Sequence, residues 1–183
     1  MSSKELIISQ TKKWITDVVA GCNFCPFAAR ELKRGSIHYE VLFPSDFEST
    51  FIALSKCFDQ LNNDSSIETT LLILPDESLS FELYLELLEQ SQLMLENDGY
   101  EGVYQLASFH PDYLFEGSDA DDAANYTNRS PYPMLHILRE ESVTTAIENH
   151  PGTEKIPQRN IEFARKKGLA HMQLLRELCM RTS

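Results

Sequence analysis

The sequence predicts a single α/β domain with a small mixed, mainly parallel four-stranded sheet covered by helices. The chain has 183 residues, about the size of one domain, and no repeat or linker divides residues 1–183. Hydrophobic residues make up 42% and charged residues 24%, as in ordinary globular proteins. Segments with strand and helix patterns alternate along the chain, which favours parallel pairing through right-handed crossovers.

Periodicity and capping residues locate the elements. Apolar residues at helical spacing predict helices, and short apolar runs bounded by Pro or Gly predict strands. Gly21 and Gly35 end the first two helices, and Pro26 suits the first turn of the second. Ser45 with Glu48 forms a capping-box pattern that opens the third. In order, we expect helices over 4–20 and 26–32, a strand over 36–43, a helix from 45, a strand over 69–74, a helix over 80–97, a strand over 102–109, a long loop over 110–133, a strand over 134–139, and helices over 141–149 and 158–180.

The order of these elements predicts the strand directions. The first three strands alternate with helices and are expected to run parallel. The link from the third strand to the fourth has no obvious helix, so we expect the fourth strand to run antiparallel. An α+β arrangement is the alternative. A ferredoxin-like fold would need a hairpin between the second and third strands, where a helix is expected instead.

Composition excludes some classes of partner. The formal net charge of −12 argues against binding to duplex nucleic acid or to an anionic membrane surface, since both need clustered Lys and Arg. The first residues lack the apolar stretch of a signal peptide, and the longest apolar runs are too short to span a bilayer. We therefore expect a cytoplasmic protein with no nucleic-acid or membrane partner. The sequence makes no prediction of oligomeric state.

The cysteines suggest a functional site. The chain has four, Cys22, Cys25, Cys57 and Cys179. Cytosolic thiols are normally reduced, so the Cys-x-x-Cys pair indicates metal binding or redox chemistry rather than a disulfide. A thiol at a helix N-terminus would have a lowered pKa. Cys57 and Cys179 lie beside apolar helix stripes and are expected in the core.

Topology predicts which residues meet the Cys-x-x-Cys pair. In open α/β sheets, ligands bind beyond the carboxyl ends of the strands. His110 and Asp112 follow the third strand, and an antiparallel fourth strand would bring residues 128–132 beside them. The helix after Pro26 must finish near the start of the first strand. Its other end, with Cys25, is therefore expected at the same carboxyl rim.

These residue types predict a metal-dependent enzyme that acts on a small anionic substrate. Two Cys and one His with an open fourth position form a known catalytic zinc arrangement, and iron is the other expected metal. The metal ligands would be Cys22, Cys25 and His110. The predicted catalytic residues are His110, Asp112 and Arg129, and the predicted substrate-binding residues are Arg129, Asn128, Tyr132, Arg159 and Asn160.

Two alternatives remain open. One is a thiol-based redox or nucleophilic enzyme without a metal, although a helix rather than a strand precedes the motif, unlike in thioredoxins. The other is a non-enzymatic binding module that uses the acidic surface and the long loop. The loop carboxylates Glu116, Asp119, Asp121 and Asp122 do not fit an EF-hand and are expected to be solvated. His136, inside the fourth strand, is expected to be structural.

Four sequence blocks carry a family resemblance: GCNFCPF over 21–27, YQLASFHPD over 104–112, NYTNRSPYPMLH over 125–136 and IPQRNI over 156–161. They resemble an uncharacterised bacterial family, the domain-of-unknown-function family numbered 1415. The likeness covers nearly the whole chain. The resemblance implies a stand-alone intracellular domain, and it supplies no activity and no catalytic residue.

Overall fold

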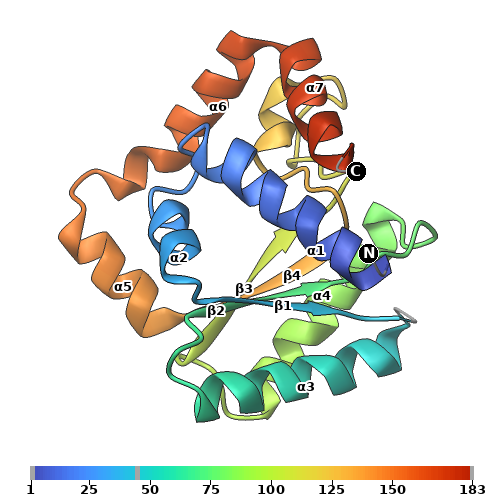
Figure 1. The fold of residues 1–183 in the computed structure, drawn as a ribbon, viewed down its shortest axis with the longest axis vertical. Coiled ribbons are helices and arrows are strands. Elements are labelled where there is room, and N and C mark those ends of the chain that lie inside the picture. The colour runs from blue at the N-terminus through green and yellow to red at the C-terminus, as the bar shows by residue number, and fades with distance from the viewer. Residues whose placement is uncertain (1–2, 44–45, 182–183) are drawn as a thin grey trace.

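A computed structural model describes residues 3–43 and 46–181 as one layered α/β arrangement (Figure 1). The predicted capping residue Ser45 lies outside the described residues. The elements are α1 (Ser3–Trp14), the π-helical η1 (Ile15–Ala20), α2 (Ala28–Arg34), β1 (Ile37–Val41), α3 (Phe47–Asn63), β2 (Thr69–Ile73), α4 (Phe81–Asn97), β3 (Tyr104–Phe109), the 3-10 helix η2 (Ala123–Thr127), β4 (Met134–Arg139), α5 (Glu140–Asn149), the 3-10 helix η3 (Thr153–Lys155), α6 (Ile156–Lys167) and α7 (Leu169–Met180).

The sheet is mixed, and the prediction that it is mainly parallel is wrong. The strand order is β1-β2-β4-β3. Only β1 and β2 pair in parallel, whereas β4 pairs antiparallel with both β2 and β3. The strand directions agree with the expectation, because β4 runs opposite to the other three. The pairing differs because Met134, Leu135 and Ile137 of β4 are all fully buried. A strand that is apolar on both faces is most stable inside the sheet.

Helices cover both faces of the sheet and enclose two cores. Figure 1 shows α3 and α4 below the sheet, α1, α2, α6 and α7 above it, and α5 beside its left end. Alternate residues of β4 supply the two cores: Met134 packs with the upper helices, and Leu135 and Ile137 pack with α3 and α4. This alternation is the two-residue period of a strand buried on both sides. Within the described ranges, no helix has the length and apolar character needed to cross a membrane.

Two helices differ from their predicted form. The first changes from α1 to the π-helical η1 and ends at Gly21. A Cβ at Gly21 would lie 2.3 Å from the Asp17 carbonyl oxygen, so only glycine fits this turn. The segment predicted as one helix over 158–180 is broken at Gly168, whose φ of +86° favours glycine. The chain therefore turns there and packs α7 against α1.

Candidate functional site

The Cys-x-x-Cys segment connects η1 to α2 and is held in place by α6. Asn23 has a φ of +56°, which asparagine tolerates better than most residues. The Arg159 guanidinium donates a hydrogen bond to the Asn23 carbonyl oxygen. Asn160 donates from Nδ2 to the Phe24 carbonyl oxygen at 2.8 Å. Arg159 and Asn160, predicted to bind substrate, thus position the loop that carries Cys22 and Cys25.

The two thiols of this loop have different surroundings. Both are free cysteines and partly exposed. Cys22 packs against the upper core, and burial raises the pKa of its thiol, which nearby Lys167 offsets only in part. This direction is opposite to that expected for a thiol at a helix N-terminus. Cys25 precedes Phe27, the N-cap residue of α2, and lines a cavity above the sheet.

His110 follows β3, as predicted, but its ring is used by the fold. Its side chain is buried, with Nδ1 accepting a hydrogen bond from the Asp112 N–H at 3.0 Å and Nε2 lying 3.0 Å from the Leu79 carbonyl oxygen. Because Nδ1 accepts, the proton is on Nε2 and is donated to Leu79. Burial lowers the pKa of His110, which favours the neutral ring. Asp112 holds the ring through its backbone, and its side chain is exposed.

The structure does not assemble Cys22, Cys25 and His110 into one metal site. Across residues 3–43 and 46–181, no group of three or more His, Cys, Asp or Glu side chains is arranged to hold a metal ion. The length of α2 explains this. Its 7 residues span only about 10 Å, too short to carry the chain from the carboxyl edge to the start of β1. Cys25 and Ile37, the first residue of β1, line the same cavity above the sheet.

The other predicted substrate-binding residues also make internal contacts. Arg129 donates to the Tyr113 and Ala120 carbonyl oxygens at 3.0 and 3.1 Å. Asn128 donates to the Ser108 carbonyl oxygen at 3.4 Å. The Tyr132 hydroxyl donates to Gln10 in α1. These side chains fasten the long loop and the start of β4.

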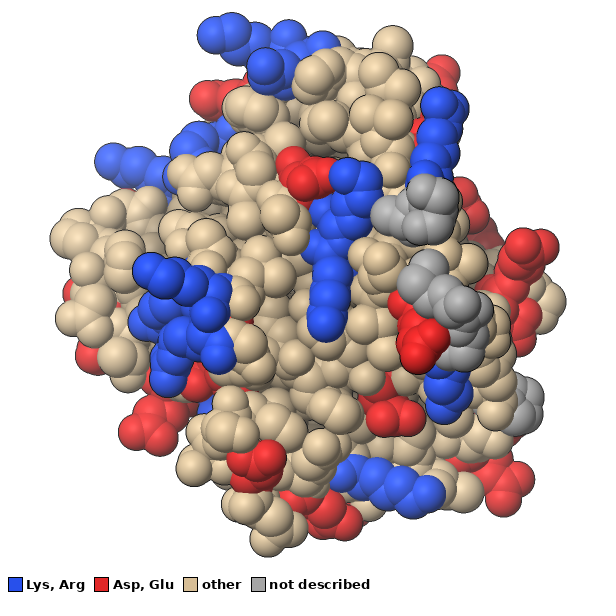
Figure 2. Space-filling view, viewed as in Figure 1, with Lys and Arg blue, Asp and Glu red and all other residues tan. Residues whose placement is uncertain are grey.

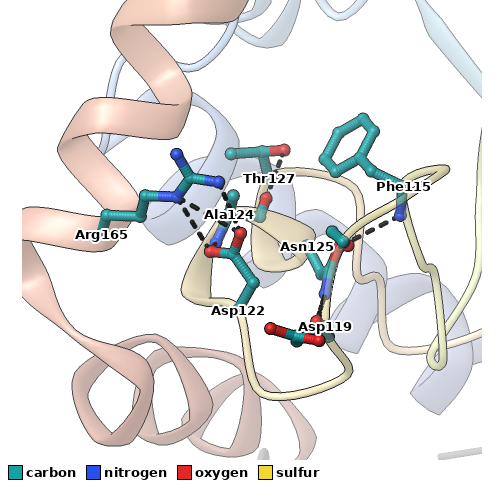
Figure 3. A network of polar contacts seen from close by, with 8 residues as sticks. Phe115, Asp119, Asp122, Ala124, Asn125, Thr127 and Arg165 are labelled. Carbon is teal, nitrogen blue, oxygen red and sulfur yellow. Dashed lines mark hydrogen bonds and ion pairs between the residues drawn. The ribbon is translucent and has the colours of Figure 1, made fainter.

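The long loop is further organised by a polar network (Figure 3). Fully buried Asn125 accepts from the Phe115 N–H at 3.1 Å and donates to the Asp119 carbonyl oxygen at 2.9 Å. Asp122 was expected to be solvated, but it caps η2 and forms an ion pair with Arg165 of α6 at 2.6 Å. The hydrogen bond from Arg165 holds the pKa of Asp122 below its usual value. The loop is thereby tied to α6.

A cavity of about 330 Å³ lies between the sheet and its upper helices. Its floor includes Leu71, His136 and Ala107, which are register neighbours on β2, β4 and β3. Its walls include Trp14 of α1 and Ala146 of α5. Ala107 and Ala146 are small, so they leave space that larger side chains would fill. Most of the lining is apolar, which is typical of a pocket for a small molecule.

His136 places a polar ring on the cavity floor. Its Nε2 lies 2.6 Å from Thr69 Oγ1, which in turn donates its only proton to the Ile137 carbonyl oxygen at 2.6 Å. Nε2 must therefore carry a proton and donate it to Thr69, which leaves Nδ1 as an acceptor. Among the described residues, Nδ1 has no hydrogen-bond partner, and it is not a buried atom. Burial of the ring lowers the pKa of His136 to about 4.

Charged residues near the cavity form ion pairs or hydrogen bonds with other groups of the protein. Figure 2 shows Lys and Arg side chains gathered over α2. Arg30 Nε and Arg34 lie 2.5 and 3.7 Å from the carboxylate of Glu31. Burial would raise the pKa of Glu31, but hydrogen bonds from Ser36 and Arg30 hold it below its usual value. Arg139 donates to the Leu61 and Ile67 carbonyl oxygens.

The comparison with protein families agrees with the sequence resemblance. A family model described as "Protein of unknown function (DUF1415)" matches residues 6–174. The chain belongs to this family. No curated protein and no solved structure matches it. In this DUF1415 chain, the matched range includes both the Cys-x-x-Cys loop and the cavity.

The sequence predicted only one of the residues that line the cavity of this DUF1415 chain as a site residue. Cys25 is the one predicted site residue that lines it. His136 was expected to be structural, yet the sequence carries a signal for it. Met134, His136 and Leu138 share one face of β4, and a histidine on an otherwise apolar strand face needs a polar partner or a ligand. Which face holds the cavity depends on the pairing of β4, which local patterns do not determine.

Proposed function

We propose that this DUF1415 chain binds a small, largely apolar molecule in the cavity above the sheet. The observation that supports this proposal is a mostly apolar cavity whose floor carries an unpaired hydrogen-bond acceptor, His136 Nδ1. Binding pockets commonly combine an apolar lining with a few polar groups that orient the ligand. A cavity of about 150 Å³ holds benzene in another protein, so one of about 330 Å³ has room for a molecule of two or three aromatic rings.

The single tryptophan makes this proposal testable. Trp14 is the only tryptophan in the chain and lines the cavity. N-phenyl-1-naphthylamine, an apolar dye that becomes fluorescent in apolar surroundings, should accept energy from Trp14 when it binds. At about 0.3 kcal/mol for each of its about 17 non-hydrogen atoms, a dissociation constant of about 0.2 mM is expected. Absence of saturable energy transfer would overturn the proposal.

Adjacent alanines provide a matched pair of variants. Ala28 lines the cavity, whereas Ala29 is exposed on the same helix. Ala28→Leu should fill part of the cavity and weaken dye binding about tenfold, because the added volume displaces the ligand. Ala29→Leu should leave binding unchanged. Equal affinities in the two variants would show that the dye binds elsewhere.

A second candidate function is thiol chemistry on the bound molecule. It is favoured by the position of Cys25, a free and partly exposed thiol in the cavity wall, three residues after Cys22. Bound N-phenyl-1-naphthylamine should slow the alkylation of Cys25 by iodoacetamide and leave that of exposed model thiols unaffected. Unchanged alkylation of Cys25 at saturating dye would remove this candidate.

The metal-dependent reaction expected from the sequence stays a prediction that the donor geometry does not favour. Both ring nitrogens of His110 are hydrogen-bonded to backbone groups, so metal binding would require one of these bonds to break. The test is zinc and iron analysis of protein purified without an affinity tag. Stoichiometric metal that is lost in Cys22→Ser would support a metal site formed by rearrangement of this loop.

A further inference from the structure

The hydrogen-bond pattern around His136 defines what the cavity can recognise. Thr69 Oγ1 cannot donate to His136, because its one proton goes to the Ile137 carbonyl oxygen. The imidazole is therefore held as the Nε2–H tautomer, with an acceptor lone pair on Nδ1. Low basicity keeps this state at neutral pH, since burial lowers the pKa of His136 to about 4. The ring thus offers an acceptor and carries no positive charge.

The remaining polar groups of the lining do not provide a site for an anion. Arg30 lies 2.5 Å from the Glu31 carboxylate, and Arg139 donates to two backbone carbonyl oxygens. A carboxylate or phosphate in the cavity would lose its hydration, and to pair with Arg139 it would have to compete with the Leu61 and Ile67 carbonyl oxygens that this side chain already binds. A neutral ligand avoids this loss.

We infer that the cavity ligand is a neutral, apolar alcohol or phenol whose hydroxyl group donates a hydrogen bond to His136 Nδ1. This inference rests on the proposed binding function and names the substrate class of the same site. It differs from the small anionic substrate expected from the sequence. The apolar body of the ligand contacts Leu71, Ala107 and Trp14, and the hydroxyl group satisfies the unpaired acceptor of His136 on the floor.

A pair of ligands with the same shape tests the role of the hydroxyl group. 2-Naphthol and 2-methylnaphthalene differ by one hydroxyl in place of a methyl group. Their dissociation constants are measured by displacement of N-phenyl-1-naphthylamine from the wild-type protein and from His136→Phe. The preference for 2-naphthol, expressed as the ratio of the two constants, should fall about tenfold in His136→Phe. Comparing ratios removes the difference in hydrophobicity between the ligands.

A measurement on the wild-type protein does not depend on the variant folding. The ¹⁵N resonance of His136 Nδ1 should move upfield when 2-naphthol binds and stay in place when 2-methylnaphthalene binds, because only the phenol donates to Nδ1. If both ligands displace the dye but the preference ratio and the resonance are unchanged, the inference is overturned and the binding function stands. If neither ligand nor dye binds, the binding function fails and the inference fails with it.

Discussion

His136 should make the stability of the fold depend on pH between its ordinary pKa of 6.5 and its folded-state pKa of about 4. Burial lowers its pKa from 6.5 to about 4 in the folded chain. Between these values the unfolded chain binds a proton that the folded chain does not. Stability is therefore full above pH 6.5, is lost as the pH falls from 6.5 towards 4, and is not reduced further by His136 below that.

The size of the effect follows from the same two values. From pH 6.5 to 5, about 1.5 pH units at about 1.36 kcal/mol each predict a loss of about 2 kcal/mol. This is a substantial part of the 5–15 kcal/mol by which native domains are typically stable. His110, whose pKa is also lowered by burial, acts in the same direction. The loss at pH 5 should therefore be only partly due to His136.

Urea denaturation at pH 7 and pH 5, followed by the fluorescence of Trp14, measures this loss. His136→Phe should recover about 2 kcal/mol of the difference between the two pH values. His171→Gln, at an exposed histidine of α7, is the matched control and should behave like the wild type. If His136→Phe loses as much stability as the wild type between pH 7 and 5, the histidine is not buried in the neutral form.

Two further predictions concern the Cys-x-x-Cys loop. Gly21→Ala should destabilise the fold by about 3 kcal/mol or more, because the added methyl group would clash with the Asp17 carbonyl oxygen. Urea denaturation measures this loss. A loss below about 1 kcal/mol would show that η1 adapts to the methyl group, contrary to this prediction. Asn160→Ala should cost about 1 kcal/mol and speed the alkylation of Cys25, since a hydrogen bond that holds its loop is lost. Gln158→Ala, at an exposed position on the same helix, should do neither, and equal alkylation rates in the two variants would contradict this role.

Local patterns predicted the elements well and their pairing less well. β4 was predicted over 134–139 and lies there, because its apolar run and preceding proline are local signals. Its position between β2 and β3 depends on contacts between distant segments. The break at Gly168 was missed because a glycine within a helical pattern can either continue or end a helix.

The candidate site was harder to predict, for a different physical reason. Arg129, Asn128 and Arg159 are residue types that bind ligands, but here they donate to backbone carbonyl oxygens. Every residue carries such an oxygen, so no sequence pattern reveals which one is the partner. Cys25 was predictable as a site residue because the Cys-x-x-Cys motif does form a loop between two helices, and this residue lines the cavity. The position of His136 on the cavity floor depends on the strand order of the sheet, which local patterns do not determine.

The central position of β4 also determines how the domain can open. β4 is hydrogen-bonded to β2 on one side and to β3 on the other, so it alone connects β3 to the β1–β2 pair within the sheet. Without it, β2 and β3 would each present an unpaired edge to other chains. We therefore expect the amides of β4 to exchange with solvent mainly through global unfolding, which hydrogen exchange would measure. Because β4 also carries His136, the cavity floor exists only in the completely assembled sheet.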